Sequence, residues 1–422
     1  MKKMVILHLT TRAAGGGAAD YTLNMHRNMV HAGYKSYVAV YGHSIITPNS
    51  SEISIHLSPL PFRHKLQRKI NNAYYRVFNP QNDEKYEPAG IHERICNFNA
   101  KDLVNAMPER PDVIFVHWVS FYANALYVRE LQELTGADVY YIMIDQSILS
   151  GGCHYPWDCE GYKDGCLQCK INDSYIFRYF IRQNYKFKRK YLVDQKNVIA
   201  PTQFDVERLK QCSLWEGCRV YKLIEAVDEN IFYPVRDNSD AKKRLFIPDG
   251  QKVVFFGCVD LAYPRKGMQR LIEALKKIRR NDTVFLVAGN NPIDDWTCPV
   301  INLGYVSHKT LADAYRAADV YVCPSLEDSG PQMINMSIIS GTPVVAFEMG
   351  VAFDLVHTGK TGYRAKYNDS DDLASGIDYI LHLTAEEHSR MRDRCHKLGM
   401  EKCSMKAQRD FFNNLFGRST ND

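Results

Sequence analysis

The chain has 422 residues, of which 45% are hydrophobic and 24% are charged, the composition of an ordinary globular protein. This length exceeds one ordinary hydrophobic core, so we expect two domains. The net charge of +5, from 53 basic and 48 acidic residues, is too small to indicate a nucleic-acid-binding protein, and no apolar run approaches the length that spans a bilayer.

The chain begins MKKMVILHLTTR, two lysines followed by a short apolar run. The run is too short for a signal peptide and no small-residue cleavage site follows, so it predicts a buried first strand. We therefore expect a cytoplasmic protein. In that compartment the twelve cysteines are thiols or metal ligands rather than a disulfide framework.

Short apolar and β-branched runs alternate with helical patterns through the first half of the chain. Near-continuous apolar runs are typical of parallel strands that are covered on both faces. The segment 229–240, ENIFYPVRDNSD, predicts a linker, so we place a first domain at residues 1–230. The candidate strands are 4–9, 37–41, 113–118, 139–144, 197–200 and 220–226.

The alternation restarts after the linker, which predicts a second domain over residues 231–403. Residues 266–280, KGMQRLIEALKKIRR, place Met268, Leu271, Ile272, Leu275 and Ile278 on one helical face. Residues 404–422 contain a further amphipathic helix, which we expect to cross back to the first domain. The fold class is therefore α/β, with two doubly wound, Rossmann-like domains facing across a cleft. The candidate strands are 253–259, 284–289, 300–306, 320–325 and 343–348.

Two loops that follow strands suit an anionic ligand. Gly15, Gly16 and Gly17 precede a helix, where backbone amides and the helix dipole favour anions, although a plain turn explains these glycines as well. Arg265 and Lys266 also precede a helix. Cations oppose the dipole there, so they need another reason to be present, and a diphosphate supplies one.

Residues 323–350, CPSLEDSGPQMINMSIISGTPVVAFEMG, hold the densest group of polar features. A strand ends in Pro-Ser, an acidic pair and a Gly-Pro loop follow, and a helix ends at the Gly-Thr-Pro turn before the next strand. Acidic side chains at such a strand end bind sugar hydroxyls, and loop amides bind phosphate.

This arrangement resembles the retaining, nucleotide-sugar-dependent glycosyltransferases of the GT-B fold, in the glycosyl transferases group 1 family. The resemblance covers nearly the whole chain: the glycine loop, His117 after VIFV, the RKG turn, GYVSH at 304–308 and the GTPVV turn. The stretch 151–169, GGCHYPWDCEGYKDGCLQC, is similar to an insert of one subgroup. Members of that subgroup mostly build bacterial exopolysaccharide, capsule or O-antigen.

The resemblance implies that Arg265 and Lys266 bind the donor diphosphate and that Asp328 contacts the transferred sugar. Asp328 occupies the position of the first Glu of the paired-Glu motif of the family. The other donor-binding positions that the resemblance implies are Gly16, Gly17, Val306, Glu327, Ser329, Gly330 and Asn335.

The chain departs from the family pattern at two positions. Met336 replaces the second Glu of the pair, which contacts the ribose, and neighbouring Asn335 replaces that contact only in part. Losing one charged hydrogen bond costs about 1.5–3 kcal/mol of donor affinity. Cys258 stands where the family often has Arg, and Arg265 is a candidate to compensate.

The resemblance also implies a reaction that needs no metal cofactor and retains the anomeric configuration. Cations and helix dipoles then stabilise the leaving diphosphate. His117 would lie near the donor sugar, although a structural histidine at a strand end is the alternative. Asp145 follows the strand 139–144 and would orient or deprotonate the acceptor, and a loop-capping Asp explains it almost equally well.

Cys153, Cys159, Cys166 and Cys169 have the spacing C-x5-C-x6-C-x2-C. The last pair suits half of a tetrahedral thiolate site, so a structural zinc and unliganded thiols that pack a loop both remain open. An iron–sulfur cluster has no redox partner nearby, and disulfides are the third choice in this compartment. In all three cases we expect this insert to shape the acceptor side without performing the reaction.

Residues 176–191 carry six basic and six aromatic residues and no acid, and residues 62–76 form a second basic stretch. Both suit an anionic membrane surface that carries a lipid-linked acceptor. A solvated helix face is the alternative, and single-stranded nucleic acid fits less well beside a sugar site.

The function predicted from the sequence is transfer of a sugar from a UDP- or GDP-sugar to a glycan on a polyprenyl diphosphate carrier. The expected location is the cytoplasmic face of the membrane, with no nucleic-acid partner. The alternatives are another GT-B enzyme, such as a nucleotide-sugar epimerase, and a catalytically weak partner subunit, which Met336 motivates.

Overall fold

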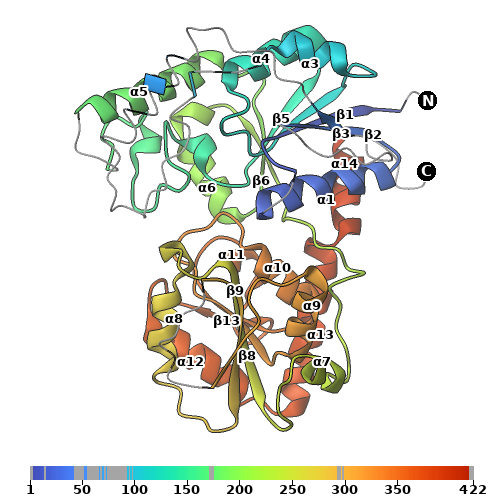
Figure 1. The fold of residues 1–422 in the computed structure, drawn as a ribbon, viewed down its shortest axis with the longest axis vertical. Helices are drawn as coiled ribbons and strands as arrows, with labels where there is room; N and C mark the ends of the chain where they lie inside the picture. Colours follow the sequence, from blue (N-terminus) through green and yellow to red (C-terminus); the bar gives the residue numbers. More distant parts are fainter. Residues whose placement is uncertain are drawn as a thin grey trace. The chain divides into compact units, whose positions relative to one another are not determined.

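The computed structural model describes residues 3–13, 16–41, 52–54, 66, 69–70, 73, 93–94, 96, 98–170, 175–291, 296 and 299–417. The chain divides into two compact units (Figure 1). The first comprises Met1–Pro201 and Asp205–Lys222, and the second comprises Thr202–Phe204 and Leu223–Asp422. The division at Lys222 falls earlier in the chain than the boundary that we expected after residue 230.

The first unit is a parallel seven-stranded sheet with the strand order β3-β2-β1-β4-β5-β6-β7. Helix α1 lies on one face of the sheet, and α3 and α4 lie together on the other (Figure 1). The strands are β1 (Val5–Thr10), β2 (Lys35–Val40), β3 (Glu52–Ser54), β4 (Val113–Val116), β5 (Asp138–Ile142), β6 (Asn197–Ala200) and β7 (Arg219–Lys222). The helices are α1 (Gly17–His31), α3 (Ala100–Ala106), α4 (Ala125–Thr135), α5 (Tyr175–Tyr191) and α6 (Gln203–Gln211).

The central strands of this sheet are buried along their whole length. Every residue of β1, β4 and β6 is buried, because helices cover both faces of a parallel sheet. The six strands that we expected in this half are confirmed, with shifts of a few residues at their ends. Strand β3 was not predicted. Short 3-10 turns at Ser147–Leu149, Gly161–Lys163 and Ser213–Trp215 shape the loops after β5 and α6.

The second unit is a parallel six-stranded sheet with the strand order β10-β9-β8-β11-β12-β13. The strands are β8 (Lys252–Asp260), β9 (Thr283–Asn290), β10 (Val300–Asn302), β11 (Val320–Cys323), β12 (Val344–Phe347) and β13 (Gly362–Ala365). The helices are α7 (Ser239–Arg244), α8 (Met268–Leu275), α9 (His308–Ala317), α10 (Gln332–Ile339), α11 (Ala352–Leu355), α12 (Ser370–Leu381), α13 (Ala385–Lys402) and α14 (Met405–Leu415).

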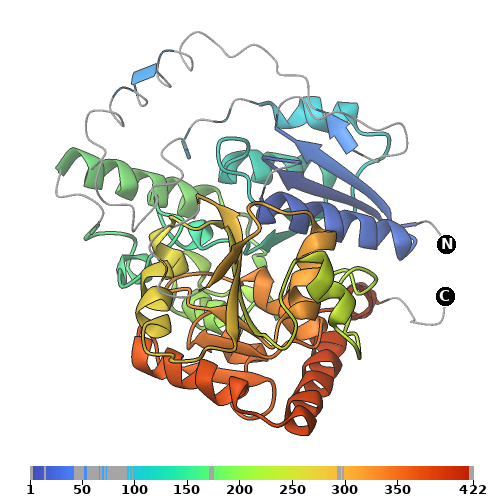
Figure 2. The same ribbon diagram turned by 60° about the horizontal axis from the view of Figure 1, so that its bottom comes forward.

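Helices α8 and α12 pack together on one face of this sheet, and α9, α10 and α13 cover the other (Figures 1 and 2). The predicted amphipathic face of α8 is confirmed for Met268, Leu271, Ile272 and Leu275, which are all buried. Ile278, expected on the same face, lies beyond the end of the helix and is half-buried. The five expected strands are present, and β13 is an edge strand that the sequence pattern did not indicate.

The segment after Lys222 belongs to the core of the second unit. Ile224, Val227 and Phe232 pack in its hydrophobic cluster, and Val227 donates a backbone hydrogen bond to Cys403. Helix α14 is joined to the same unit, because the Met405 amide donates to Glu229 Oε2. The expected crossing of this helix to the first unit stays a prediction. None of the helices described here has the length and hydropathy that a membrane span needs.

Candidate functional site

Three charged residues of the second unit meet at the carboxyl ends of adjacent strands. Arg265 and Lys266 lie in the 3-10 turn Pro264–Lys266 after β8, and Asp328 lies in the loop after β11, the neighbour of β8 in the sheet. Asp328 Oδ2 is 3.0 Å from Arg265 Nη1, and it also accepts a hydrogen bond from Lys266 Nζ. Open α/β sheets bind ligands at this edge.

The turn that carries the two cations is fixed against the next strand. Gly267 has a φ of 70°, and a Cβ added there would lie 1.8 Å from the carbonyl oxygen of Pro324. Only glycine fits this close approach. The Leu326 amide also donates to the Arg265 carbonyl over 2.8 Å, so the loops after β8 and β11 form one rigid surface.

Asp328 is ionised in this arrangement. Burial alone would raise its pKa, but Lys266 and Arg265 outweigh burial, and the net shift is downward. The Asp328 amide contacts Met349 Sδ at 3.1 Å, and the backbone of Gly350 packs against the carbonyls of Asp328 and Ser329. The acidic side chain and both cations are therefore held in place before any ligand arrives.

Four other predicted donor-binding residues lie in the loop after β11 and in helix α10, which follows it. Glu327, Ser329 and Asn335 are buried, and Gly330 is half-buried. Ser329 Oγ and Asn335 Oδ1 are buried without hydrogen-bond partners among the described residues. A buried polar atom without a partner carries a desolvation cost that a ligand can relieve. Val306 lies beyond β10, half-buried against the core of the unit.

Met336 is buried in the hydrophobic core of the second unit. The neighbouring Asn335 Nδ2 donates to the Glu225 carbonyl over 3.0 Å, so the amide group of Asn335 is already partly used. Cys258 is half-buried and its Sγ contacts the Asp260 carbonyl at 3.2 Å. Burial raises the pKa of this thiol to about 11, so Cys258 is a neutral group beside Lys266 and Arg265.

The glycine loop of the first unit begins helix α1. Gly16 is the N-cap with a φ of 124°, and the amides of Ala19 and Asp20 both bond to its carbonyl. Gly17 opens the helix, and a Cβ at either glycine would meet no atom within 4 Å. The space in front of this N-terminus therefore suits close approach of a ligand. Gly15 lies outside the described residues.

His117 directly follows β4, and its amide donates to the Leu9 carbonyl over 3.0 Å. Its ring stacks on His8 with centroids 5.1 Å apart, and its Nε2 lies 2.8 Å from His8 Nδ1. Burial lowers the pKa of His117 to about 3, so the ring is neutral. His8 was missed in the sequence, although a single histidine inside an apolar strand was a signal for it.

Asp145 follows β5 and pairs with His154, which is half-buried. Its Oδ2 is 2.6 Å from His154 Nδ1, and its Oδ1 accepts from the Ser147 amide over 2.8 Å. Burial would raise the pKa of Asp145, but His154 and Ser147 outweigh it and hold the pKa below its usual value. Asp145 thus caps its loop and also orients a histidine. Reasoning from the sequence did not assign a role to His154.

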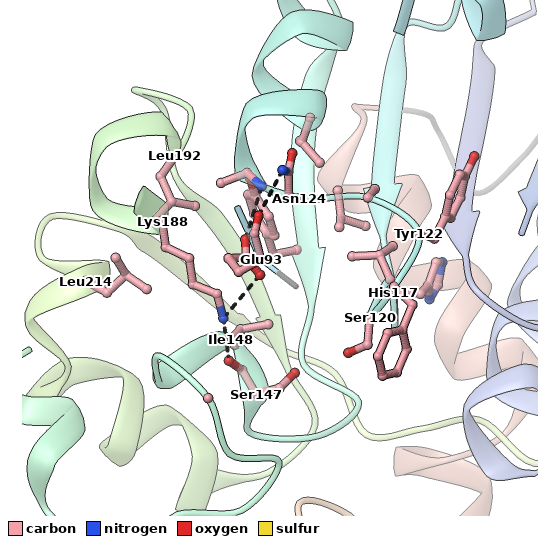
Figure 3. Close-up of a pocket in the computed structure, with 18 of the residues that line it drawn as sticks. Glu93, His117, Ser120, Tyr122, Asn124, Ser147, Ile148, Lys188, Leu192 and Leu214 are labelled. Carbon is pink, nitrogen blue, oxygen red and sulfur yellow. Dashed lines mark hydrogen bonds and ion pairs between the residues drawn. The ribbon is translucent and has the colours of Figure 1, made fainter. Parts of the chain in front are cut away.

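His117 lines a cavity in the first unit of about 880 Å³, counted with the open solvent at its mouth (Figure 3). Lys188 of α5 spans one wall: its Nζ donates to the carbonyls of Ser147 and Ser150 over 2.9 and 3.0 Å, and lies 3.8 Å from Glu93 Oε2. Its donors are therefore occupied by the protein itself. Apolar side chains complete the wall, among them Ile148, Leu192, Leu214 and Trp215.

The four cysteines of the insert are free thiols in this structure. Cys153, Cys166 and Cys169 are buried and Cys159 is half-buried. The Gly151 amide donates to Cys166 Sγ over 3.4 Å, and burial raises the pKa of Cys153 to about 12. Within the part of the chain that the structure describes, no three His, Cys, Asp or Glu side chains are placed to hold a metal. Packed thiols and a structural zinc both remain predictions for these four side chains.

Helix α5 presents basic and aromatic side chains to solvent. Tyr175, Ile176 and Tyr179 are 79%, 47% and 51% exposed near its start, and its last turn holds Lys188, Arg189 and Lys190. The inner face packs on the core through Phe177, Ile181 and Tyr185. The second basic stretch, residues 62–76, lies mostly outside the described residues.

Comparison with known proteins identifies the domain type of the second unit. Residues 250–382 match the family model described as Glycosyl transferases group 1. The chain is 22% identical over 379 residues to WcaC of Escherichia coli, named as a colanic acid biosynthesis glycosyl transferase, covering 85% of this chain and 87% of WcaC. It is 25% identical over 173 residues to the glycosyltransferase MJ1607 of Methanocaldococcus jannaschii and spans 44% of that protein, so this match covers less than half of the relative.

Solved structures agree over the whole chain. Sucrose-phosphate synthase from Thermosynechococcus elongatus superimposes with a TM-score of 0.67 at 16% identity, covering 98% of each chain. HepE of Anabaena, solved with UDP and glucose, gives a TM-score of 0.64 at 14% identity and covers 98% of this chain and 99% of its own. The chain has the GT-B fold, with two Rossmann-like units, and the match at residues 250–382 lies within the second.

Proposed function

Because the second unit carries a glycosyl transferases group 1 domain within a GT-B fold, we propose that this protein is a glycosyltransferase. It takes a sugar from a UDP- or GDP-sugar and transfers it to a growing glycan. The observation that carries the proposal is the pairing of Asp328 with Arg265 and Lys266 at the carboxyl ends of β8 and β11. The second unit binds the donor, and the first binds the acceptor.

The cation pair suits a diphosphate. Arg265 and Lys266 both bond to the Asp328 carboxylate. A nucleoside diphosphate brings at least two negative charges and accepts charge-assisted hydrogen bonds from both side chains. Once the cations turn to the diphosphate, the Asp328 carboxylate is free to accept a hydrogen bond from a hydroxyl of the transferred sugar.

The chemistry follows from these contacts. The acceptor hydroxyl oxygen forms a bond to the anomeric carbon, the bond from that carbon to the phosphate oxygen breaks, and the nucleoside diphosphate leaves with the electron pair. The acceptor proton passes to the leaving phosphate oxygen on the same face, so the anomeric configuration is retained. Arg265 and Lys266 stabilise the charge that develops on the diphosphate, a role that needs no metal cofactor.

The first unit supplies groups for the acceptor and the sugar. His117 offers a neutral ring at the end of β4, next to the 880 Å³ cavity. The pair Asp145–His154 at the end of β5 orients the acceptor hydroxyl. Neither residue forms a covalent intermediate in this scheme.

Two observations support the acceptor class that we propose: the name of one relative and the exposed side chains of helix α5. WcaC is named for colanic acid biosynthesis, which supports a polysaccharide acceptor for this chain. The exposed Tyr175, Ile176 and Tyr179 together with the basic last turn of α5 suit an anionic membrane surface. We therefore assign the protein a glycan acceptor on a polyprenyl diphosphate carrier, at the cytoplasmic face of the membrane.

Binding of UDP and GDP, followed by calorimetry, tests the donor site. Lys266→Gln removes one cation and should weaken nucleotide binding by about 1.5–3 kcal/mol, the value of a hydrogen bond to a charged group. Lys277→Gln is the matched control, since Lys277 is an exposed residue just after α8 that pairs with Asp371 of α12. Equal loss in both variants, or no binding of either nucleotide by the native chain, would overturn the proposal.

A catalytically weak partner subunit is the second candidate, and Met336 is the observation that favours it. A buried methionine cannot accept a hydrogen bond from a ribose as a glutamate does. In that case nucleotides bind weakly and no sugar is released from any donor. A nucleotide-sugar epimerase is separated by product analysis, because it returns an isomerised sugar with no acceptor consumed.

A further inference from the structure

His117 is one end of a buried hydrogen-bond chain through the first unit. His117 Nε2 lies 2.8 Å from His8 Nδ1, His8 Nε2 lies 3.1 Å from Ser36 Oγ, and Ser36 Oγ lies 2.8 Å from His26 Nδ1. The four residues come from β4, β1, β2 and α1, and all four are buried. The other ring nitrogen of His117, Nδ1, is buried without a partner among the described residues.

Each ring of the chain is neutral. Burial lowers the pKa of His8 well below its usual value, and neighbouring His117 and His26 lower it further. Burial also lowers the pKa of His26 to about 4 and that of His117 to about 3. A neutral imidazole has one donor nitrogen and one acceptor nitrogen, so the position of a single proton decides what each ring offers to its neighbour.

Only two arrangements satisfy every bond of the chain. In the first, His26 Nδ1 donates to Ser36, Ser36 donates to His8 Nε2, and His8 Nδ1 donates to His117 Nε2, which places the proton of His117 on Nδ1. In the second, all bonds reverse, and His117 Nδ1 becomes an acceptor. A third arrangement, with Ser36 accepting from both His8 and His26, leaves its hydroxyl proton buried without a partner among the described residues, at a cost of about 1–3 kcal/mol.

We propose that His8, Ser36 and His26 are positioning residues for His117. The proton positions along this hydrogen-bond chain are coupled, so they decide whether His117 Nδ1 donates to a sugar hydroxyl or accepts from it. The inference rests on the proposed function, because it takes the ligand of His117 to be a sugar hydroxyl. A hydroxyl both donates and accepts, so either state of the chain pairs with it. The neutral ring of His117 can therefore pair with a hydroxyl that donates to it and also with a hydroxyl that accepts from it.

The coupling is measured without turnover, by the ¹⁵N chemical shifts of the imidazole nitrogens in full-length protein labelled on histidine. Ser36→Ala cuts the chain between His8 and His26, and we expect it to change the proton distribution between Nδ1 and Nε2 of His117, which Ser36 does not touch. Ser213→Ala is the matched control, since its hydroxyl bonds to Tyr185 Oη elsewhere in the same unit. It should leave the His117 signals unchanged.

A His117 spectrum that is the same in Ser36→Ala and in the native protein would overturn the coupling. His26→Phe provides a second cut, at the end of the chain, and keeps the inference testable where Ser36→Ala does not fold. In the folded variants we expect kcat for release from the accepted nucleotide sugar to fall several-fold, because the proton position of His117 no longer follows from the hydrogen bonds of the chain. KM for the donor should stay within a factor of two or so, because Arg265 and Lys266 hold the diphosphate.

The two hypotheses fail separately. If NMR shows the coupling but the native protein releases no nucleotide from any donor, the histidine chain stands and the proposed function is wrong. If the native protein turns over but the His117 signals are the same in both variants, the proposed function stands and the coupling is wrong.

Discussion

Asp328 Oδ2 lies 3.0 Å from Arg265 Nη1 and also accepts from Lys266 Nζ, although the residues are more than sixty positions apart in the chain. The contact exists because β8 and β11 are neighbours in the sheet and both loops leave the same edge. One buried carboxylate thus holds two cations together, and in the function that we propose it is released when a diphosphate binds the cations.

Replacing Asp328 by Asn should separate binding from transfer. Asp328→Asn removes the charge that competes with the donor for Arg265 and Lys266, so UDP or GDP should bind several-fold more tightly. Transfer should fall about 100-fold, because the sugar hydroxyl loses its carboxylate partner. Calorimetry and nucleotide-release kinetics measure the two effects on the same preparation.

The control is Asp313→Asn, at another carboxylate of the second unit that pairs with two arginines. Asp313 bonds to Arg244 over 2.7 Å and to Arg316 over 3.0 Å. Its loss should lower stability and leave nucleotide affinity unchanged. If Asp328→Asn weakens nucleotide binding, the exchange of partners that we describe is wrong.

Met336→Glu should not restore a ribose contact. The side chain of residue 336 lies in the apolar core, where an ionised carboxylate without a partner is strongly unfavourable. We expect a lower melting temperature and no gain in nucleotide affinity. Met336→Leu is the control, and it should keep the native melting temperature and the native nucleotide affinity. A tighter nucleotide complex in Met336→Glu would show that position 336 reaches the donor, and it would strengthen the case for a weakened partner subunit.

The buried histidines should make the protein less stable in mild acid. The folded-state pKa values of His26 and His117 are about 4 and about 3, below the value of about 6.5 in the unfolded chain. Between those values the unfolded state binds more protons, so stability is full above pH 6.5 and falls as the pH decreases. Each histidine contributes a slope of about 1.4 kcal/mol per pH unit.

Urea unfolding at pH 7, 6 and 5 measures this slope. Glu93 acts in the opposite direction, because burial raises its pKa and protonation then favours the folded state. The contribution of one histidine is therefore obtained by difference, from native protein and His26→Gln. An identical slope in both would contradict the buried, neutral state of His26.

Metal analysis tests the insert. Packed thiols predict no stoichiometric zinc in protein purified without chelator, and no change in melting temperature on treatment with EDTA. Cys166→Ala should still lower stability by about 1–2 kcal/mol, because a buried side chain is lost from the core. One zinc per chain, lost together in Cys166→Ala and Cys169→Ala, would show instead that the four thiols converge on a metal.

Helix α5 should bind anionic vesicles. Replacing Lys186, Arg189 and Lys190 by Gln removes three basic side chains, each worth about 1 kcal/mol near an anionic surface. Binding to phosphatidylglycerol vesicles should therefore weaken roughly 100-fold and become less sensitive to salt. Co-sedimentation with vesicles measures the effect.

The control for that experiment carries the same change in net charge on another surface. Lys397, Lys402 and Lys406 are exposed residues of α13 and α14. If their replacement by Gln weakens vesicle binding as strongly as the α5 variant, then net charge rather than α5 determines the attraction.

The sequence was most informative where burial is continuous. Strands such as β4 and β12 are unbroken apolar runs, which a parallel sheet buries because helices cover both of its faces. Edge strands β3 and β13 were missed because they are short and carry polar residues, so their pairing partners and not their own patterns define them.

The donor cluster could be predicted because its residues directly follow strands in the sequence. The histidine chain could not, since His8, Ser36 and His26 lie on three different elements and only the packing of α1 on β1 and β2 brings them together. The cysteine spacing placed four thiols in one insert, but spacing alone does not fix whether they share a metal or pack against apolar neighbours.

Nucleotide release from UDP-, GDP- and ADP-sugars, with and without membrane extract as the acceptor source, tests the central claim most directly. We expect nucleotide release from one donor. The release rate should rise when the extract is added, and the release should be lost in Asp328→Asn. Release from no donor, with no thermal shift by any nucleotide, would contradict it.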